Sequence, residues 1–337
     1  MTVEHFGTLP DGQEVTRVTL RGGGLTARLI SWGAVLQDLR LDGHAPPLVL
    51  GFEDLASYLA HSPYFGATAG RCANRIRGGQ FSLDGQSFGT DRNALGRHTL
   101  HGGSAGIGKR NWTLTAQGPT SAEFVIEMAD GEMGFPGAMT VRAVFSLLEG
   151  GTLDIRYTAQ ADRPTLCNIA HHSYFVLDGT GHILDHRLCV AADSYLPTDA
   201  DFVPTGEVRP VTGTAYDLRH GRTITDALAG GAIDCNFCLS GARTALREIG
   251  WLESPTSNVR MTIHSTEPGL QVYDAGRIEI PVPGLDGRKI APYAGLALEP
   301  QVWPDAIHHP DWPQAILRPG ENYAQHTQFV FTKGKAA

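Results

Sequence analysis

The sequence predicts an all-β sandwich, and three observations carry that prediction. Short runs of alternating apolar and polar residues recur along the chain, as expected of strands that bury one face. The chain contains 41 glycines and 20 prolines among its 337 residues, which is a high density of turn formers between those runs. Helical windows are few and do not alternate with the strand candidates, so a parallel βα architecture is not indicated.

The strand candidates follow one another along most of the chain. The first three are Val15–Leu20, Leu25–Ile30 and Val35–Leu41. Asp84-Gly85 then separates two short strand-like runs, Phe81–Leu83 and Gln86–Phe88, and this dipeptide predicts a tight hairpin turn. The later candidates are Trp112–Ala116, Ala122–Met128, Met139–Leu147, Thr152–Ala159, His186–Ala191, Val259–Ser265, Leu270–Asp274 and Gln328–Thr332.

Helices are predicted only at Glu53–Ala60 and Thr223–Ala229. No internal repeat and no Ser/Gly-rich or charged linker divides the chain. We therefore expect residues 1–337 to form a single domain, which is large but acceptable for an all-β fold.

Composition excludes several classes of partner. The net charge is −8 and no stretch of lysine and arginine forms a basic stripe, so neither nucleic acid nor an anionic membrane surface is an expected partner. No apolar run reaches the length of a transmembrane helix. The first twelve residues lack the apolar core of a secretory signal, so we expect a cytoplasmic protein.

The five cysteines are few, odd in number and widely spaced, which indicates free thiols in a reducing compartment. Cys235 and Cys238 have the C-x-x-C spacing, but no second pair and no thioredoxin-like context accompanies them. We interpret that spacing as coincidence and predict no metal site and no cofactor.

Glu299 is the first candidate for chemistry. It follows the apolar run Ala294–Leu298, which is typical of a buried strand. Burial would raise the pKa of this carboxyl above its ordinary value of about 4.3 and make it a stronger base. An ordinary structural carboxylate paired with an arginine would produce the same local pattern.

Histidines form the second group of candidates. His171 and His172 lie in an apolar, strand-like run, where neighbouring side chains face opposite ways, so only one of them can face a given cleft. A histidine that titrates near pH 6.5 suits general acid catalysis at neutral pH. His101 precedes two glycines that allow a close approach of the backbone.

Other polar residues stand in turns or at strand starts: Asn74, Arg75, Asp234 and Gln271. Each of them reads equally well as turn chemistry when taken alone. No G-x-S-x-G motif, no phosphate-binding glycine loop and no H-E-x-x-H spacing occurs. The set therefore indicates acid–base chemistry rather than nucleophilic or metal-dependent catalysis.

Taken in order, the motifs resemble those of the galactose mutarotase (aldose 1-epimerase) family over nearly the whole chain, from about Arg17 to Phe331. The segments that carry the resemblance are Val49–Phe52, Gly70–Ile76, Leu100–Gly103, Asn168–Leu177, the Asp234 segment, Glu267–Gln271, Leu298–Gln301 with Pro304-Asp305, and Leu317–Tyr323.

The resemblance implies a β-supersandwich with an open sugar-binding cleft, and a cofactor-independent interconversion of the α and β anomers of a free monosaccharide. It implies Glu299 as general base and His172 as general acid. The residues that it implies as sugar ligands, or as lining the same edge of the cleft, are His101, Asp234, Arg75, Asn74, Gln271, Ser173 and Tyr174. A monomer or a homodimer is expected.

The chain departs from the family pattern at His171, Val176 and Ile233, and again at Ala306–His308. We expect these departures near the rim of the cleft, where they would influence the choice of sugar and leave the acid–base pair intact. A hexose, a pentose and an acidic sugar all remain open as substrates.

Three other functions remain open. One is a metal-dependent enzyme, which activity that survives chelation would exclude. A sugar-phosphate epimerase of similar fold would need a basic pocket, which Lys109 and Arg110 could supply. A non-catalytic carbohydrate-binding protein would not need both Glu299 and His172, because binding alone requires no acid–base pair.

Overall fold

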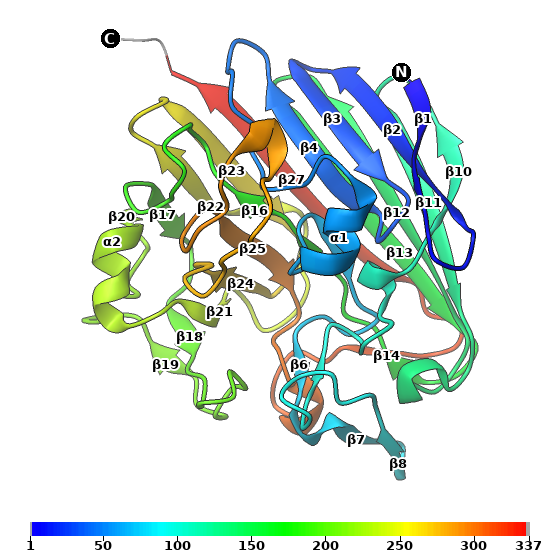
Figure 1. The fold of residues 1–337 in the computed structure, drawn as a ribbon. Helices are drawn as coiled ribbons and strands as arrows, with labels where there is room; N and C mark the ends of the chain where they lie inside the picture. Colours follow the sequence, from blue (N-terminus) through cyan, green and yellow to red (C-terminus); the bar gives the residue numbers. More distant parts are fainter. Residues whose placement is uncertain (1, 335–337) are drawn as a thin grey trace.

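The structure is a computed structural model, and it describes residues 2–334. Three antiparallel sheets form most of the molecule (Figure 1). The first sheet contains, in spatial order, β1 (Thr2–Thr8), β2 (Glu14–Gly22), β3 (Leu25–Ile30) and β4 (Val35–Leu41). The largest contains β10 (Thr113–Gln117), β11 (Ser121–Met128), β12 (Met139–Leu148), β13 (Thr152–Ala161), β27 (Tyr323–Lys333), β23 (Val259–Ser265), β22 (Arg247–Ser254), β17 (Arg187–Val190) and β20 (Arg222–Thr223).

The third sheet carries most of the candidate site. Its spatial order is β16 (Tyr174–Phe175), β25 (Leu296–Gln301), β24 (Gly269–Tyr273), β21 (Asp234–Cys238), β18 (Ser194–Leu196) and β19 (Arg209–Pro210). Four short pairs complete the strands: β14 (Thr165–Leu166) with β26 (Ile316–Leu317), β15 (Ala170–His172) with β5 (Ala67–Ala69), β6 (Arg75–Ile76) with β9 (Thr99–Leu100), and β7 (Gln80–Leu83) with β8 (Gln86–Gly89).

Helical elements are short. The two α-helices are α1 (Leu55–His61) and α2 (Ile224–Ala227). Single 3-10 turns occur at η1 (Arg77–Gly79), η2 (Ile107–Lys109), η3 (Glu132–Gly134), η4 (Leu228–Gly230), η5 (Leu285–Gly287) and η6 (Ala306–His308). Among residues 2–334, none of these helices has the length and hydrophobicity needed to cross a membrane.

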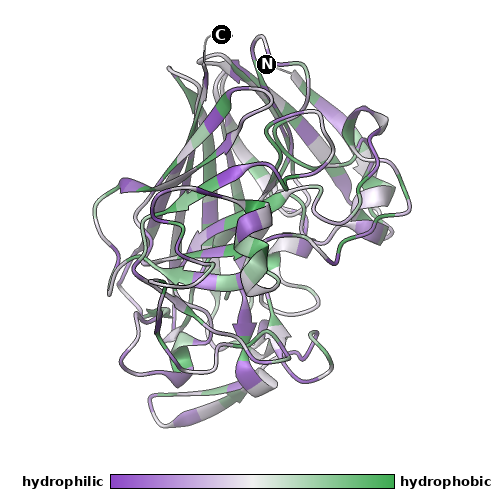
Figure 2. Cartoon of the chain, turned by 90° about the vertical axis from the view of Figure 1, so that its left-hand side faces the viewer, coloured by the Kyte–Doolittle hydropathy of each residue, from purple (hydrophilic) through white to green (hydrophobic). Residues whose placement is uncertain are grey.

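Hydrophobic and hydrophilic residues alternate along many of the strands (Figure 2). In the third sheet, Phe237, Val272 and Leu298 point into the main hydrophobic core, where they join residues of the largest sheet such as Phe145 and Phe329. Because side chains alternate every residue, the neighbouring polar residues of the same strands must point to the opposite face. That opposite face is where the candidate site lies.

The predicted all-β architecture is confirmed, with small shifts at the element boundaries. The Asp84-Gly85 hairpin forms between β7 and β8, and both turn residues have positive φ (50° and 77°). The helix predicted at residues 53–60 is observed as α1, capped by Asp54, whose carboxylate accepts from the Ser57 amide at 2.8 Å. The helix predicted at 223–229 is observed as α2, which is continued by η4.

Several strands were not predicted, and the two longest of them are β1 and β22. β1 is an edge strand whose residues are exposed or half-buried, so it shows no clear alternation. β22 contains a bulge between Glu248 and Gly250, which interrupts the period-two pattern. Irregularities of this kind remove the local signal on which the prediction of a strand depends.

The Gly70–Ile76 run contains two arginines, and the first of them, Arg71, holds a turn. Its buried guanidinium donates to the backbone oxygens of Pro136 and Gly137 and to the Thr165 hydroxyl, at 3.0–3.1 Å. The run therefore contains one structural arginine, and Arg75 stays free for another role.

We expect Arg71→Met to lower the free energy of unfolding by about 3 kcal/mol, because three buried acceptors lose a charged donor. Urea unfolding followed by tryptophan fluorescence would measure the change. Arg318→Met is the control, since the Arg318–Asp84 ion pair is exposed and its removal should leave stability unchanged. Equal stabilities of the two variants would contradict this role for Arg71.

Candidate active site

A cavity of about 210 Å³, open to solvent, lies on the polar face of the third sheet. Eight of the nine residues predicted for the site line it. They are Asn74, Arg75, His101, His172, Tyr174, Asp234, Gln271 and Glu299. The chain thus brings together β6, β15, β16, β21, β24, β25 and the turn after β9.

Strand register fixes the floor of the cavity. Gln271 on β24 lies directly opposite Glu299 on β25, and Tyr273 lies opposite Asp234 on β21. Residues opposite each other in an antiparallel pair share one face of the sheet. The register alone therefore places these four side chains on the same surface.

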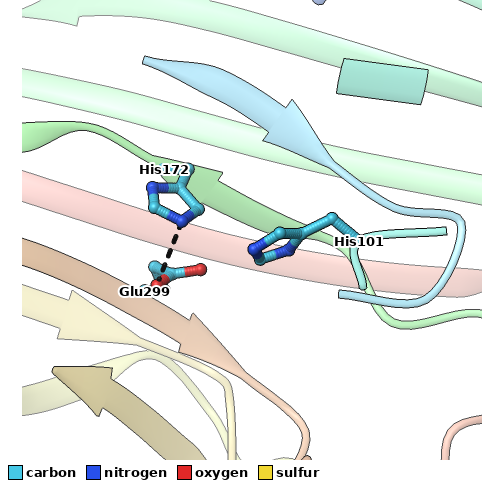
Figure 3. Close-up of side chains that lie close together, drawn as sticks. All are labelled: His101, His172 and Glu299. Atoms are coloured by element: carbon cyan, nitrogen blue, oxygen red, sulfur yellow. Dashed lines mark ion pairs between the residues drawn. The ribbon is translucent and has the colours of Figure 1, made fainter. Parts of the chain in front are cut away.

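The side chains of His172 and Glu299 lie next to each other in the cavity (Figure 3). The His172 Nε2 atom lies 3.5 Å from Glu299 Oε1, and both side chains are buried. His172 comes from β15 and Glu299 from β25, so the pair joins two segments far apart in the sequence. Glu299 Oε2 and His172 Nδ1 have no hydrogen-bond partner among the described residues.

Burial controls the ionisation of this pair. It raises the pKa of Glu299 well above its ordinary value, and the nearby Asp234 carboxylate raises it further, while Arg75 opposes the shift. Burial lowers the pKa of His172 to about 4. Both groups therefore favour their neutral forms. For the carboxyl of Glu299, the apolar run that precedes it predicts this outcome.

His101 is held in one tautomer by the backbone. Its Nδ1 atom accepts from the Asn74 amide at 3.2 Å, and its own amide donates to the Asn74 carbonyl at 2.9 Å. Burial also lowers its pKa well below the ordinary value, so the ring is neutral. The remaining proton is then on Nε2, which makes His101 a hydrogen-bond donor toward the cavity.

The same hydrogen bond bears on metal binding. One ligand atom each from His101, His172 and Glu299 lies within 4.8 Å of the other two, which is a spacing that could hold a cation. A metal on His101 Nε2 would need the proton on Nδ1, where the Asn74 amide already donates. The donor set therefore fits hydrogen bonding to a ligand better than it fits metal coordination.

Asp234 and Arg75 provide the charged end of the cavity. The Gln271 amide donates to Asp234 Oδ1 at 2.8 Å, and Arg277 donates to Oδ2 at 2.9 Å. Burial raises the pKa of Asp234, and the charges of Arg75 and Arg277 oppose that rise. The half-buried guanidinium of Arg75 forms no ion pair within residues 2–334, so its donors remain available to a ligand.

Ser173 does not line the cavity, in contrast to the sequence-based expectation. Its hydroxyl bonds to His171 Nε2 at 2.7 Å, and the His171 ring packs near Phe145 and Phe329 in the core. Alternation along β15 explains both facts, since His171 and His172 point to opposite faces. Tyr174 does line the cavity, and its hydroxyl donates to the Pro63 carbonyl at 3.1 Å.

Three of the departures from the family pattern, at His171, Val176 and Ile233, also lie elsewhere than expected. Val176 and Ile233 are buried in the main core, and His171 is surrounded by core aromatic rings. None of the three lines the cavity. They are changes in core packing rather than at the rim.

The lining also contains residues that the sequence analysis did not predict, and three of them carry polar groups: Tyr64, Tyr273 and Arg277. Tyr273 was detectable, because it stands two residues after Gln271 on a predicted strand and so shares its face. Tyr64 and Arg277 lie in irregular segments without a period, where no local pattern indicates direction. The Tyr64 ring lies 4.6 Å from the ring of His101 and 5.9 Å from that of His172.

Comparison with known proteins agrees with this geometry. The aldose 1-epimerase family model matches residues 16–330. Mouse galactose mutarotase is 38% identical over 337 residues, covering 97% of each chain, and Escherichia coli K12 aldose 1-epimerase is 32% identical, covering 96% of each. A solved GalM/aldose epimerase homologue from C. elegans has a TM-score of 0.88 at 27% identity, covering 94% of this chain and 98% of that one. The chain belongs to the aldose 1-epimerase family and is an isomerase.

Proposed function

We propose that the protein interconverts the α and β anomers of a free aldose, with Glu299 as general base and His172 as general acid. The observation that carries this proposal is the buried His172–Glu299 pair, with 3.5 Å between Nε2 and Oε1, at one end of a cavity lined by hydrogen-bonding groups. Two groups whose surroundings push their pKa values apart are the usual arrangement for paired acid and base roles.

The reaction needs no covalent intermediate. Glu299 takes the proton of the C1 hydroxyl while His172 gives a proton to the ring oxygen, and the bond between C1 and that oxygen breaks. The open-chain aldehyde rotates about its C1–C2 bond. Closure on the other face of the carbonyl carbon returns the first proton from Glu299 and the second to His172, so both residues end as they began. Each such transfer typically contributes about 10²–10⁴-fold.

For this reaction, the His172–Glu299 pair must hold one transferable proton, shared between the imidazole and the carboxyl group. A neutral Glu299 with a neutral His172 contains as many protons as an ionised Glu299 with a charged His172. The reactive form is therefore reached by a transfer between the two groups, without exchange with solvent. The sugar's C1 hydroxyl and the Arg75 charge both favour the ionised carboxylate once the cavity is filled.

The number of protons that the His172–Glu299 pair holds predicts the pH dependence of kcat/KM. Activity should fall below an apparent pKa of about 4. In that range His172 is charged while Glu299 is still protonated, so Glu299 cannot accept a proton from the sugar. Activity should fall again above the raised pKa of Glu299, where the pair has lost its only proton. Polarimetry over a pH series, corrected for spontaneous mutarotation, would measure both limbs. An acid limb near 6.5, the ordinary value for histidine, would contradict the assignment.

A neutral aldohexose suits the lining, and relatives at 38% identity named galactose mutarotase support galactose as one substrate. The sugar-phosphate alternative is less well supported, because Arg110 forms an ion pair with Glu132 and neither Lys109 nor Arg110 lines the cavity. Lys109 lies at its edge, with its Nζ 4.9 Å from the centre of the Tyr64 ring.

Exchange between the two anomeric proton signals in NMR spectra would test the proposal. We expect faster exchange for free galactose or glucose, unchanged by a chelator, and little effect on galactose 6-phosphate or glucose 6-phosphate. Acceleration confined to the phosphorylated sugars would favour the alternative function. Binding of sugar without any acceleration would favour a carbohydrate-binding protein.

A further inference from the structure

Arg277 is presented to the cavity by a rigid turn. The buried carboxylate of Asp274 accepts from the Gly276 amide through Oδ1 and from the Ile233 amide through Oδ2, each at 2.7 Å. The Ile278 amide donates to the Ala275 carbonyl at 3.0 Å. The turn that follows β24 is thus tied to the start of β21, which also carries Asp234.

The guanidinium of Arg277 is held on two sides. One side is the ion pair with Asp234, at 2.9 Å. The other is the ring of Phe202, whose centroid lies 3.8 Å from the Arg277 Cζ atom, and the Arg75 Cζ lies 5.5 Å from the same ring. Stacking and a hydrogen-bonded carboxylate together fix the plane of the group while leaving other N–H donors free.

The loop that carries Phe202 is itself anchored. Asp199 accepts from Arg77 at 3.2 Å, and Asp201 pairs with Arg97 at 2.6 Å and with His98 at 3.1 Å. The Phe202 backbone has a positive φ of 62°, so its ring is directed by a specific loop conformation. Phe202 therefore forms a wall behind the Arg277 guanidinium.

We propose that Arg277 is a specificity-determining residue, which donates hydrogen bonds to the oxygen substituents of the sugar on the side away from C1 and holds Asp234 in position to accept from them. The inference rests on the proposed function, which places C1 between Glu299 and His172. It adds to the Glu299–His172 chemistry a residue that acts on the choice of sugar and not on proton transfer.

Strand spacing supports that placement. Asp234 and Glu299 lie on β21 and β25, with β24 between them and an offset of two residues along the strands, so their backbones are about 12 Å apart. In a pyranose ring, C4 lies across the ring from C1. A sugar whose C1 is at Glu299 therefore directs its C4 and C5 substituents toward the Asp234–Arg277 pair, where galactose, glucose and xylose differ from one another.

The chemistry of the pair suits hydroxyl groups. Asp234 already accepts from Gln271 and Arg277, and each carboxylate oxygen has a further lone pair for a sugar hydroxyl. Arg277 donates from its remaining N–H groups to hydroxyl oxygens. Donor and acceptor lie side by side, so they distinguish an axial from an equatorial hydroxyl by direction as well as by distance.

The test measures kcat and KM separately for galactose, glucose and xylose with the wild type, Arg277→Met and Arg277→Lys. We expect Arg277→Met to raise KM by about tenfold for at least one of the hexoses, to change KM for xylose by a different factor, and to leave kcat within about threefold, because these contacts form equally in the ground and transition states. Lysine restores the charge, so Arg277→Lys should recover part of the loss in KM.

Arg318→Met is a matched control, because Arg318 is as exposed as Arg277 (45%) and also pairs with an aspartate. Kinetics of Arg277→Met that equal those of this control would overturn the inference. So would a loss of kcat shared equally by all three sugars with KM unchanged. If Arg277→Met does not fold, Phe202→Leu provides the test instead. Removal of the aromatic ring should raise KM, and the sugars should rank by the size of that increase as expected for Arg277→Met. A wild type inactive on every sugar would instead overturn the proposed function.

Discussion

Replacement of Glu299 by glutamine should lower kcat about 10³-fold and change KM little. Glutamine keeps the shape of the side chain and can still bond to a sugar hydroxyl, but it cannot accept a proton at neutral pH. The expected loss is within the range of about 10²–10⁴-fold typical of a positioned base. Polarimetry under saturating sugar would measure it directly.

Glu267→Gln provides the control for that variant. Glu267 is as buried as Glu299, but it pairs with Arg243 at 2.7 Å and does not line the cavity. Its replacement should lower the free energy of unfolding and leave the kcat of the folded enzyme unchanged. An effect on kcat of similar size in the two variants would mean that the loss follows from structural damage.

Replacement of His172 by asparagine should lower kcat about 10²–10³-fold, because the ring oxygen would then leave without a positioned proton donor. The alkaline limb of the pH profile should also move, since Glu299 loses its coupled partner. A pH series of kcat/KM for the variant would show both effects.

The neighbouring histidine offers a close comparison. His171 has its pKa lowered to about 3 by burial in the core, and it contacts the cavity through no side-chain atom. His171→Asn should therefore retain kcat, even though it changes the residue next to His172. If His171→Asn lost activity as severely as His172→Asn, the assignment of the acid to His172 would be wrong.

These two positions also show how much the sequence could predict. Alternation in an apolar run requires His171 and His172 to face opposite ways, and it cannot say which of them faces the cavity. The resemblance to the family favoured His172, and the structure places that ring 3.5 Å from Glu299. The strand at Glu299 and the raised pKa of its carboxyl followed from the apolar residues before it.

Other features depend on pairings between distant strands, which no local pattern contains. Gln271 meets Glu299 and Asp234 only because β24 lies between β25 and β21. Arg277 was missed because its direction is set by a turn that Asp274 holds through backbone amides. Ser173 was misplaced because its neighbours in sequence line the cavity while its own hydroxyl bonds to His171.

The measurement that tests the central claim most directly is polarimetry of freshly dissolved α-D-galactose and α-D-glucose, with the wild type and with Glu299→Gln at equal concentrations. We predict that the wild type speeds the approach to the equilibrium rotation without changing its final value, and that the variant follows the spontaneous rate. Acceleration that survives in Glu299→Gln would contradict the role of Glu299 as base. A wild type that leaves both sugars at the spontaneous rate would contradict the proposed reaction for these substrates.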